Sequence, residues 1–200
     1  MNATGRLLGG IGPRTRRVVY GEPSPAELVD ELALMVQVDR AHVVMLAERQ
    51  LIAHDAAAAL LRCVAELAGQ DFAPLLTRPA PRGLYLMYED YLIERLGADV
   101  GGVLHTGRSR NDLKATTTAL RLRRWLLDFA ADAVRLLGVL LARARAYRAV
   151  PMPVYTHFQA AMPITYGYYL LGVALAVQRE IAALDSASQG LDTCPLGAGA

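Results

Sequence analysis

The sequence predicts an all-α protein, and three observations support this prediction. Ala (33 residues) and Leu (32 residues) fill almost a third of the 200-residue chain, and both are strong helix formers. Phe occurs three times and Trp once. Residues 112–137 contain neither Gly nor Pro, so they can form a helical rod of about 39 Å. Such a rod is typical of a bundle of long helices.

Capping signals place the first long helix. Ser24 can cap a helix, Pro25 suits its first position, and Glu27 stands at the third position of a capping box. The apolar spacing that follows predicts a helix over residues 25–49. Asp39 is the single polar residue on the apolar face of this predicted helix.

Gly and Pro divide the remaining chain into helices and connections. The Gly-rich residues 1–23 are expected to form an irregular arm, before an N-terminal helical domain over residues 24–104. Residues 105–200 are expected to begin a central helical-bundle domain that is incomplete in this chain. Further helices are expected over residues 55–68, 84–96, 112–137 (extending to Arg148) and 164–184.

Composition and charge exclude several classes of protein. A hydrophobic fraction of 54% with 20% charged residues excludes a disordered chain. A net charge of +2 without a helix-turn-helix signal argues against nucleic-acid binding. No apolar run reaches the roughly 18 residues that a membrane span needs. Cys63 and Cys194 are far apart and have no metal-ligand spacing, which indicates buried thiols in a reducing compartment. We therefore expect a cytoplasmic protein without a membrane partner.

The segment His105-Thr106-Gly107-Arg108-Ser109-Arg110-Asn111-Asp112 concentrates polar groups immediately before the long helix. Arginines can bind carboxylates in a bidentate manner, and a helix N-terminus adds N–H donors. Together these groups predict a site for a small, multiply anionic ligand. The alternative is a capped helix start, with Asn111 or Asp112 as the cap and the arginines in solvent.

A second polar segment, Thr156-His157-Phe158-Gln159, lies between a Pro-rich turn and the last helix. His157 can act as a general acid or base, because an imidazole titrates near neutral pH. The alternative is a histidine that only satisfies backbone groups. His42 and His54, on the earlier helices, are expected on the surface. Periodicity alone does not indicate whether the two polar segments meet.

At these residues the sequence resembles the argininosuccinate lyases of the fumarase/aspartase superfamily. The segment His105–Asp112 is similar to their first signature, and Thr156–Gln159 is similar to their second, usually written T-H-L-Q. The tail Cys194–Ala200 resembles the P-L-G-[SA]-G-A segment that follows. The resemblance covers about residues 25–200, with matching order and spacing.

The resemblance implies a fold, an assembly and a reaction. Family members have an all-α fold with a central bundle of long helices, and they form homotetramers whose active sites are shared by several subunits. They need no cofactor or metal. A proton leaves the carbon next to a carboxylate, an aci-carboxylate forms, and the C–N bond breaks to release fumarate. The implied reaction converts argininosuccinate, a small-molecule N-succinyl substrate, into arginine and fumarate.

The roles of individual residues are also implied by the resemblance. Ser109, Arg110 and Asn111 would bind the carboxylate and amino groups of the substrate. His157 would be the catalytic histidine that protonates the departing nitrogen, and Thr156 would contact the substrate. Gln159 would lie beside the substrate or support the residues that contact it.

Several positions depart from the family pattern. Leu113-Lys114 replaces Gln-Val after the first signature, and Ala160-Ala161-Met162 replaces Arg-Ala-Gln after the second. Glu89-Asp90-Tyr91-Leu92 stands where the family has Glu-Asp-Ile-His, so an active-site histidine is expected to be lost at Leu92. These changes keep the fumarate half of the site. They leave open a relative that cleaves a different N-succinyl adduct in secondary metabolism.

The third signature of the family, a Gly-Ser-Ser loop that carries the catalytic base, has no counterpart among the four serines of this chain. The glutamate that pairs with the catalytic histidine cannot be assigned either. We therefore expect the chain to represent the N-terminal portion of a longer fold, with exposed apolar surface and little activity by itself. A non-catalytic structural homologue is the alternative from a different functional class.

Overall fold

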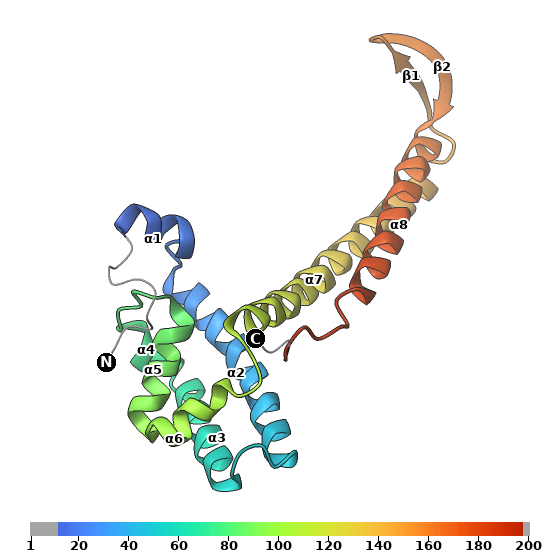
Figure 1. Ribbon diagram of the computed structural model, residues 1–200. Coiled ribbons are helices and arrows are strands. Elements are labelled where there is room, and N and C mark those ends of the chain that lie inside the picture. The colour runs from blue at the N-terminus through green and yellow to red at the C-terminus, as the bar shows by residue number, and fades with distance from the viewer. Residues whose placement is uncertain (1–11, 198–200) are drawn as a thin grey trace. The chain divides into compact units, whose positions relative to one another are not determined.

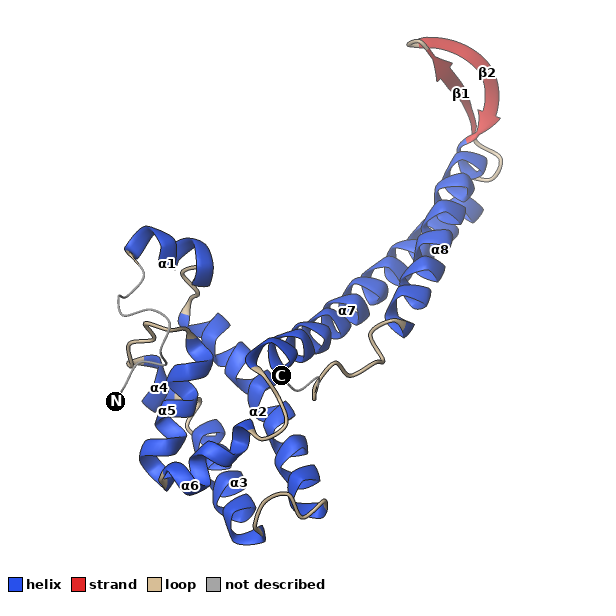
Figure 2. Ribbon diagram, in the orientation of Figure 1, coloured by secondary structure: helices blue, strands red, loops and turns tan. Residues whose placement is uncertain are grey.

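The computed structural model describes residues 12–197 of the chain. The described residues form two compact units, drawn in Figure 1 and Figure 2. The first unit comprises the residues up to Thr117 together with Pro195–Gly197, and the second comprises Thr118–Cys194. The division falls inside a long helix, whereas the sequence places a boundary before His105. The difference arises because the first two turns of that helix pack within the first unit.

The first unit is helical. Its capping box is formed as predicted, because the Glu27 side chain accepts from the Ser24 backbone N–H and the Ser24 hydroxyl accepts from the Glu27 N–H. The described elements are α1 (Pro13–Tyr20), α2 (Pro25–Glu48), α3 (His54–Gly69), α4 (Ala73–Leu76), α5 (Leu84–Leu96), α6 (Ala98–Gly101) and the 3-10 helix η1 (Gly102–His105). The predicted helices 25–49, 55–68 and 84–96 are confirmed to within one residue at each end.

Helix α1 shows that the expectation of an irregular arm is wrong for residues 13–20. Pro13 occupies the first position of the helix, where its missing N–H costs nothing. Gly21 ends the helix at φ +70°, a conformation that favours glycine. The stretch between the expected helices 84–96 and 112–137 is also partly helical, since α6 and η1 lie there.

The core of the first unit lies between α2, α3 and α5. Leucine, valine and tyrosine side chains from these helices are excluded from solvent, as helical periodicity predicts. Gly101 lets α6 approach α5, because a Cβ there would lie 2.7 Å from backbone atoms of Leu92 and Ile93. The fully or almost fully buried side chains include Leu32, Leu34, Val43, Leu46, Leu60, Val64, Leu67, Tyr88 and Leu92.

The second unit contains most of α7 (Arg110–Ala146), two strands and α8 (Tyr166–Gln189). The predicted extension of α7 beyond Gly138 is confirmed, and its 37 residues correspond to a helix of about 55 Å. Strands β1 (Pro151–Thr156) and β2 (Gln159–Thr165) pair antiparallel, with Pro151 opposite Thr165 and a register shift between Val154 and Tyr155. This small hairpin was not predicted, although the fold class as a whole is confirmed.

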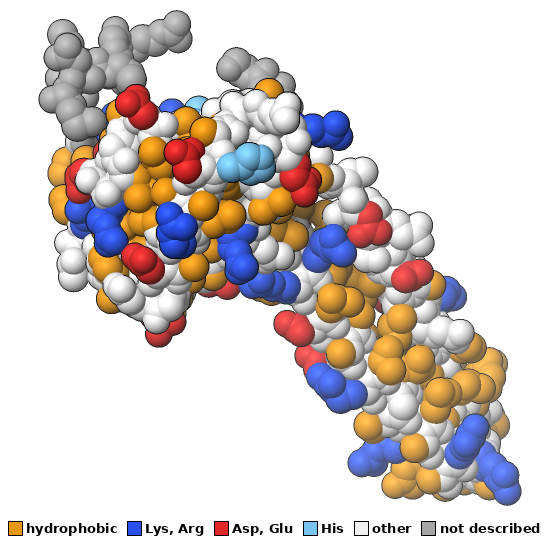
Figure 3. Space-filling model, turned by 90° about the horizontal axis from the view of Figure 1, so that it is seen from below, with side chains coloured by type: hydrophobic (Ala, Val, Ile, Leu, Met, Phe, Trp, Pro, Cys, Tyr) orange, Lys and Arg blue, Asp and Glu red, His pale blue; other side chains and the backbone are white. Residues whose placement is uncertain are grey.

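Much of the apolar surface in the second unit is exposed, and Figure 3 shows hydrophobic side chains along one face of the molecule. Of residues 118–194, all of which the structure describes, only Ala144, Gly167, Leu170 and Ala174 are buried. None of the described helices is both long and apolar enough to cross a membrane. The exposed apolar side chains include Trp125, Leu127, Phe129, Val134, Leu136, Val139, Tyr168, Tyr169 and Leu175.

Candidate functional site

The first signature segment is built as a capped helix start. Ser109 precedes α7, and its hydroxyl oxygen accepts from the Asn111 N–H at 3.1 Å. Asp112 Oδ1 accepts from the Ser109 N–H at 2.9 Å, which completes a reciprocal cap. The cap is therefore Ser109. The alternative with Asn111 or Asp112 at the cap position is wrong, because Asp112 lies three residues after the cap and its carboxylate accepts from the Ser109 N–H.

This cap leaves hydrogen-bond donors for a ligand. The Ser109 oxygen uses a lone pair to accept the Asn111 N–H, so its own O–H remains able to donate. The Arg110 and Asn111 side chains are exposed beside it. The first N–H groups of α7 also point out of the helix end, where the helix dipole favours negative charge. The arrangement is suited to a carboxylate.

Arg108, by contrast, points into the protein. Its Nη1 lies 2.6 Å from Asp39 Oδ1 of α2, and both side chains are essentially inaccessible to solvent. The Tyr88 hydroxyl donates to the other Asp39 oxygen at 2.8 Å. Asp39, the polar exception on an apolar helix face, thus anchors the signature segment to α2.

His42 provides a second anchor on α2. Its Nε2 donates to the Thr106 carbonyl at 2.9 Å, and the side chain is buried. The expectation that His42 lies on the surface is therefore wrong, while His54 is exposed as expected. Burial, together with the nearby Arg108 cation, lowers the pKa of His42. Burial also raises the pKa of Asp39, although Arg108 acts in the opposite direction.

Helix α5 contacts the same segment through two side chains one turn apart. The Tyr85 hydroxyl lies 2.6 Å from His105 Nδ1, and Glu89 Oε1 lies 3.4 Å from the same nitrogen. Leu92, where the sequence suggested a lost active-site histidine, is fully buried in the core. Tyr85 and Glu89 are the α5 side chains that make polar contacts with His105 in the described structure.

The Gly-rich tail returns to the signature segment within the first unit. The Gly197 N–H donates to Asp112 Oδ2 at 3.0 Å, so the two oxygens of this buried carboxylate hold both the helix cap and the tail. Ala198, Gly199 and Ala200 lie outside the described residues. Cys194, just before this tail, is exposed, and the expectation of two buried thiols holds only for Cys63.

The second signature forms the β1–β2 turn in the second unit. Thr156 pairs with Gln159, and His157 and Phe158 form the two-residue loop at φ +49° and +62°. Positive φ at both loop positions is typical of a tight hairpin turn. Residues other than glycine rarely adopt a positive φ. All four side chains are exposed. His157 is therefore presented at the tip of a hairpin.

The structure thus brings the predicted site residues together in two groups. Ser109, Arg110 and Asn111 lie at the start of α7 in the first unit, whereas Thr156, His157 and Gln159 lie on the hairpin in the second. Sequence reasoning missed the residues that hold the first group. Two features of the sequence could have indicated such residues. Asp39 is a charged residue on an apolar helix face, and Ser109 and Asp112 have the spacing of a capping box. The sequence assigned no such role to Asp39, Tyr85 or Glu89, and it named Asp112 only as a candidate cap.

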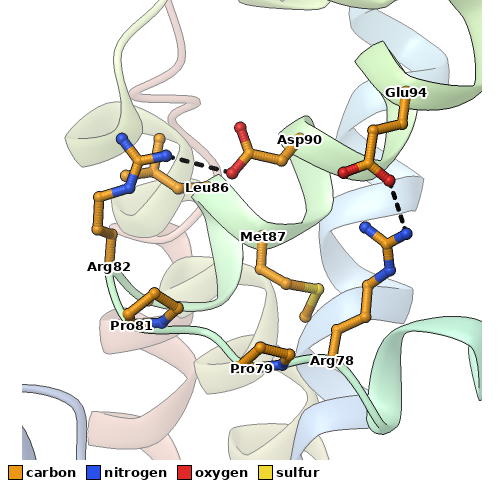
Figure 4. Close-up of a pocket in the computed structure, with 9 residues that line it drawn as sticks. Arg78, Pro79, Pro81, Arg82, Leu86, Met87, Asp90 and Glu94 are labelled. Atoms are coloured by element: carbon orange, nitrogen blue, oxygen red, sulfur yellow. Dashed lines mark hydrogen bonds and ion pairs between the residues drawn. The ribbon is translucent and has the colours of Figure 1, made fainter. Parts of the chain in front are cut away.

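A separate pocket of about 350 Å³ opens on the surface of the first unit (Figure 4). Two ion pairs cross it, Arg78–Glu94 at 2.7 Å and Arg82–Asp90 at 3.2 Å, and Met87 lies between them. None of the signature residues lines this pocket. Within residues 12–197, no cluster of three or more His, Cys, Asp or Glu side chains is arranged to hold a metal ion.

Comparison with known proteins gives consistent matches. The profile of a family described as lyase matches residues 31–200. Argininosuccinate lyase from Methanocaldococcus jannaschii is 35% identical over 162 residues, which cover 81% of this chain and 34% of that relative. Argininosuccinate lyase from Haloarcula marismortui is 39% identical over 165 residues, with coverages of 82% and 32%. The chain therefore spans about a third of the length of these curated relatives.

Solved structures give the same picture. EDDS lyase in complex with formate superposes with a TM-score of 0.77 at 27% identity, covering 96% of this chain and 38% of that one. A fumarate lyase from Mesorhizobium sp. BNC1 superposes with a TM-score of 0.65 at 24% identity, with coverages of 84% and 40%. The second likeness concerns the fold alone.

Proposed function

This chain belongs to the lyase family, and we propose that it contributes to a C–N lyase that eliminates fumarate from an N-succinyl adduct. The resemblance to argininosuccinate lyases is confirmed by relatives above 30% identity, although the match covers only about a third of their length. The proposed reaction is the cleavage of argininosuccinate into arginine and fumarate.

The observation that carries this proposal is the geometry of the first signature. The α7 N-terminus presents the Ser109 hydroxyl beside the exposed Arg110 and Asn111 side chains. A succinyl group carries two carboxylates, and each can accept hydrogen bonds from a hydroxyl, a guanidinium or a helix N–H. We assign these three residues to the succinyl half of the substrate. There they stabilise the negative charge that develops on a carboxylate as the neighbouring proton leaves.

We assign proton transfer to the second signature. In the elimination, the C–H bond next to a carboxylate and the C–N bond both break, and the departing nitrogen takes up a proton. The exposed imidazole of His157 is proposed as the general acid that delivers this proton. Thr156 and Gln159, paired at the base of the turn, are proposed to contact the substrate on either side. No serine of this chain is assigned to the removal of the C–H proton.

A second candidate substrate is a different N-succinyl adduct. The likeness to EDDS lyase, with a TM-score of 0.77, supports this alternative. The replacements after both signatures, at Leu113-Lys114 and Ala160–Met162, also support it. In this case the succinyl half of the site is unchanged, and only the recognition of the amine half differs.

We further propose a cytoplasmic homo-oligomer, and specifically a tetramer with active sites shared between subunits. The support is the exposed apolar surface of α7 and α8, which a free chain would leave in water. The two groups of site residues lie in different units of the chain, so an active site assembled from several subunits can draw on both.

The test is production of fumarate, followed by its ultraviolet absorbance, by the full-length protein with argininosuccinate and a panel of N-succinyl amines. We expect His157→Asn to lower turnover at least a hundredfold, because general acid catalysis typically contributes that much. Asn is chosen because it tolerates the positive φ of the turn. His54→Asn, at an exposed histidine of α3, is the matched control. Absence of fumarate with every adduct would exclude the proposed reaction.

A further inference from the structure

Three titratable side chains meet at the beginning of the first signature, outside the residues assigned above. His105 lies at the end of η1, four residues before Ser109. Its Nδ1 faces α5, where the Tyr85 hydroxyl is 2.6 Å away and Glu89 Oε1 is 3.4 Å away. The Glu89 side chain is 17% exposed, whereas the His105 side chain is 42% exposed. One edge of the imidazole is therefore held by α5, and the ring remains partly accessible.

The contacts define which nitrogen of His105 carries the proton. Burial, together with the nearby Glu89 carboxylate, raises the pKa of Tyr85 to about 12, so its hydroxyl stays protonated near neutral pH. At 2.6 Å this hydroxyl is the closer neighbour and donates to an unprotonated Nδ1. A neutral imidazole then carries its hydrogen on Nε2. If the ring gains a second proton, Nδ1–H can donate to Glu89 and Nε2 keeps its hydrogen.

We propose that His105 is a further substrate-binding residue, whose Nε2–H, oriented by Tyr85 and Glu89, donates to a carboxylate of the substrate. This inference deepens the proposed function and rests on it, since the carboxylate belongs to the N-succinyl substrate or to the fumarate product. His105 binds the ligand directly, and Tyr85 and Glu89 are positioning residues that act through it.

The Nε2 atom, which no described residue bonds, distinguishes this role from a purely structural one. A structural histidine uses both nitrogens within the protein, as a buried ring must satisfy its polar atoms. His105 Nε2 has no hydrogen-bond partner among the residues that the structure describes. His42, which contacts the same segment from α2, shows the contrast, because its Nε2 already donates to the Thr106 carbonyl. The partly exposed His105 ring, four residues before Ser109, therefore adds a donor to a segment whose other polar groups favour anions.

The first experiment determines which ring nitrogen of His105 carries the hydrogen. Histidine labelled with ¹⁵N in the full-length protein allows each ring to be assigned by nitrogen chemical shifts, and His105→Asn identifies the His105 signals among the four histidines. We expect the Nε2–H form, with an unprotonated Nδ1. Tyr85→Phe should increase the fraction of the Nδ1–H form, because Glu89 then becomes the partner. A wild-type His105 that is mainly Nδ1–H would overturn the inference without affecting the proposed lyase activity.

The second experiment measures fumarate affinity by calorimetry in two variants that separate the nitrogens. The amide of Gln reaches the position of Nε2, whereas the shorter Asn reaches only that of Nδ1. We expect His105→Gln to bind fumarate within about threefold of the wild type, and His105→Asn to bind it at least tenfold more weakly. Equal affinity in wild type and His105→Asn, or weaker binding by the Gln variant, would show a structural role instead. If the wild type does not bind fumarate, the proposed function fails together with this ligand, whereas the nitrogen shifts still report the proton on His105.

Discussion

The two units of the chain differ in how completely their helices bury apolar side chains. The first unit surrounds α2 with α3 and α5, so leucines such as Leu32 and Leu60 are fully buried. The second unit consists largely of α7, the hairpin and α8, and of its four buried residues all except Leu170 are Ala or Gly. Similar helical sequences therefore give a complete core in one unit and an uncovered apolar surface in the other, because two helices alone cannot cover each other on all sides.

The polar groups of the two units also differ in how far they are buried. The first unit encloses the Asp39–Arg108 ion pair and fixes its signature segment from several helices. The second unit presents His157 on an exposed turn that only local pairing holds. The first group of site residues is thus held by buried contacts from other helices, whereas pairing of the two strands positions the second.

Breaking the buried ion pair should give the largest effect. Asp39→Ala leaves the Arg108 guanidinium buried without a counter-charge, and we expect a loss of about 3–5 kcal/mol in the stability of the first unit. Hydrogen exchange of the α2 amides measures this loss locally. The double variant Asp39→Leu with Arg108→Met should recover most of it. Glu94→Gln, in the exposed ion pair with Arg78, is the control and should have little effect.

The packing of α8 against the end of α7 can be tested at a single glycine. A Cβ at Gly167 would lie 2.5 Å from the Ala144 carbonyl oxygen, so Gly167→Ala should cost about 1–3 kcal/mol through overpacking. Gly172, in the same helix, has open space around it, and Gly172→Ala should stabilise the helix by about 0.5–1 kcal/mol. The fluorescence of Trp125, the single tryptophan, reports unfolding of this unit. Equal effects of the two substitutions would contradict the close packing at Gly167.

The proposed assembly covers the exposed apolar face of the second unit. Leu127 is 70% exposed on α7, and Leu127→Glu would place a charge where a partner subunit should pack. We expect about tenfold weaker association, equivalent to about 1.4 kcal/mol, in analytical ultracentrifugation. Val18→Glu in α1 is the control, since Val18 is also largely exposed, at 80%, but lies in the first unit. A Leu127→Glu protein that associates as the wild type does would exclude this face from the interface.

The smallest expected effect is a pH dependence in the first unit. The pKa of His42 is lowered in the folded protein, so the unfolded chain binds the proton first as the pH falls below about 6.5. The free energy of unfolding should therefore decrease on acidification, by less than about 1.4 kcal/mol per pH unit for one proton. Urea unfolding at several pH values measures the slope. His42→Gln retains a donor for the Thr106 carbonyl and should show a shallower slope.

The sequence by itself determined the helical elements and several of their ends. Ser24 and Glu27 specify the start of α2, and the absence of Gly and Pro from residues 112–137 specifies the body of α7. Both signals can be read from the sequence, because helix caps and helix propensity act within a few residues. The signature residues Ser109, Arg110 and Asn111 were also found from the sequence, since their side-chain types and order are local properties. The hairpin was not, because its turn uses His157 and Phe158 at positive φ, where local preferences favour glycine or asparagine.

Only the tertiary structure decided which polar residues face inward. Asp39 and Arg108 are separated by more than one helix in the sequence, yet they form a buried pair because α2 packs against the signature segment. The same packing buries His42 and leaves His105 partly accessible. Burial depends on which helices meet, and a residue's neighbours in the sequence do not contain that information. Many apolar side chains of α7 and α8 are exposed for the same reason, because no other described helix packs over them.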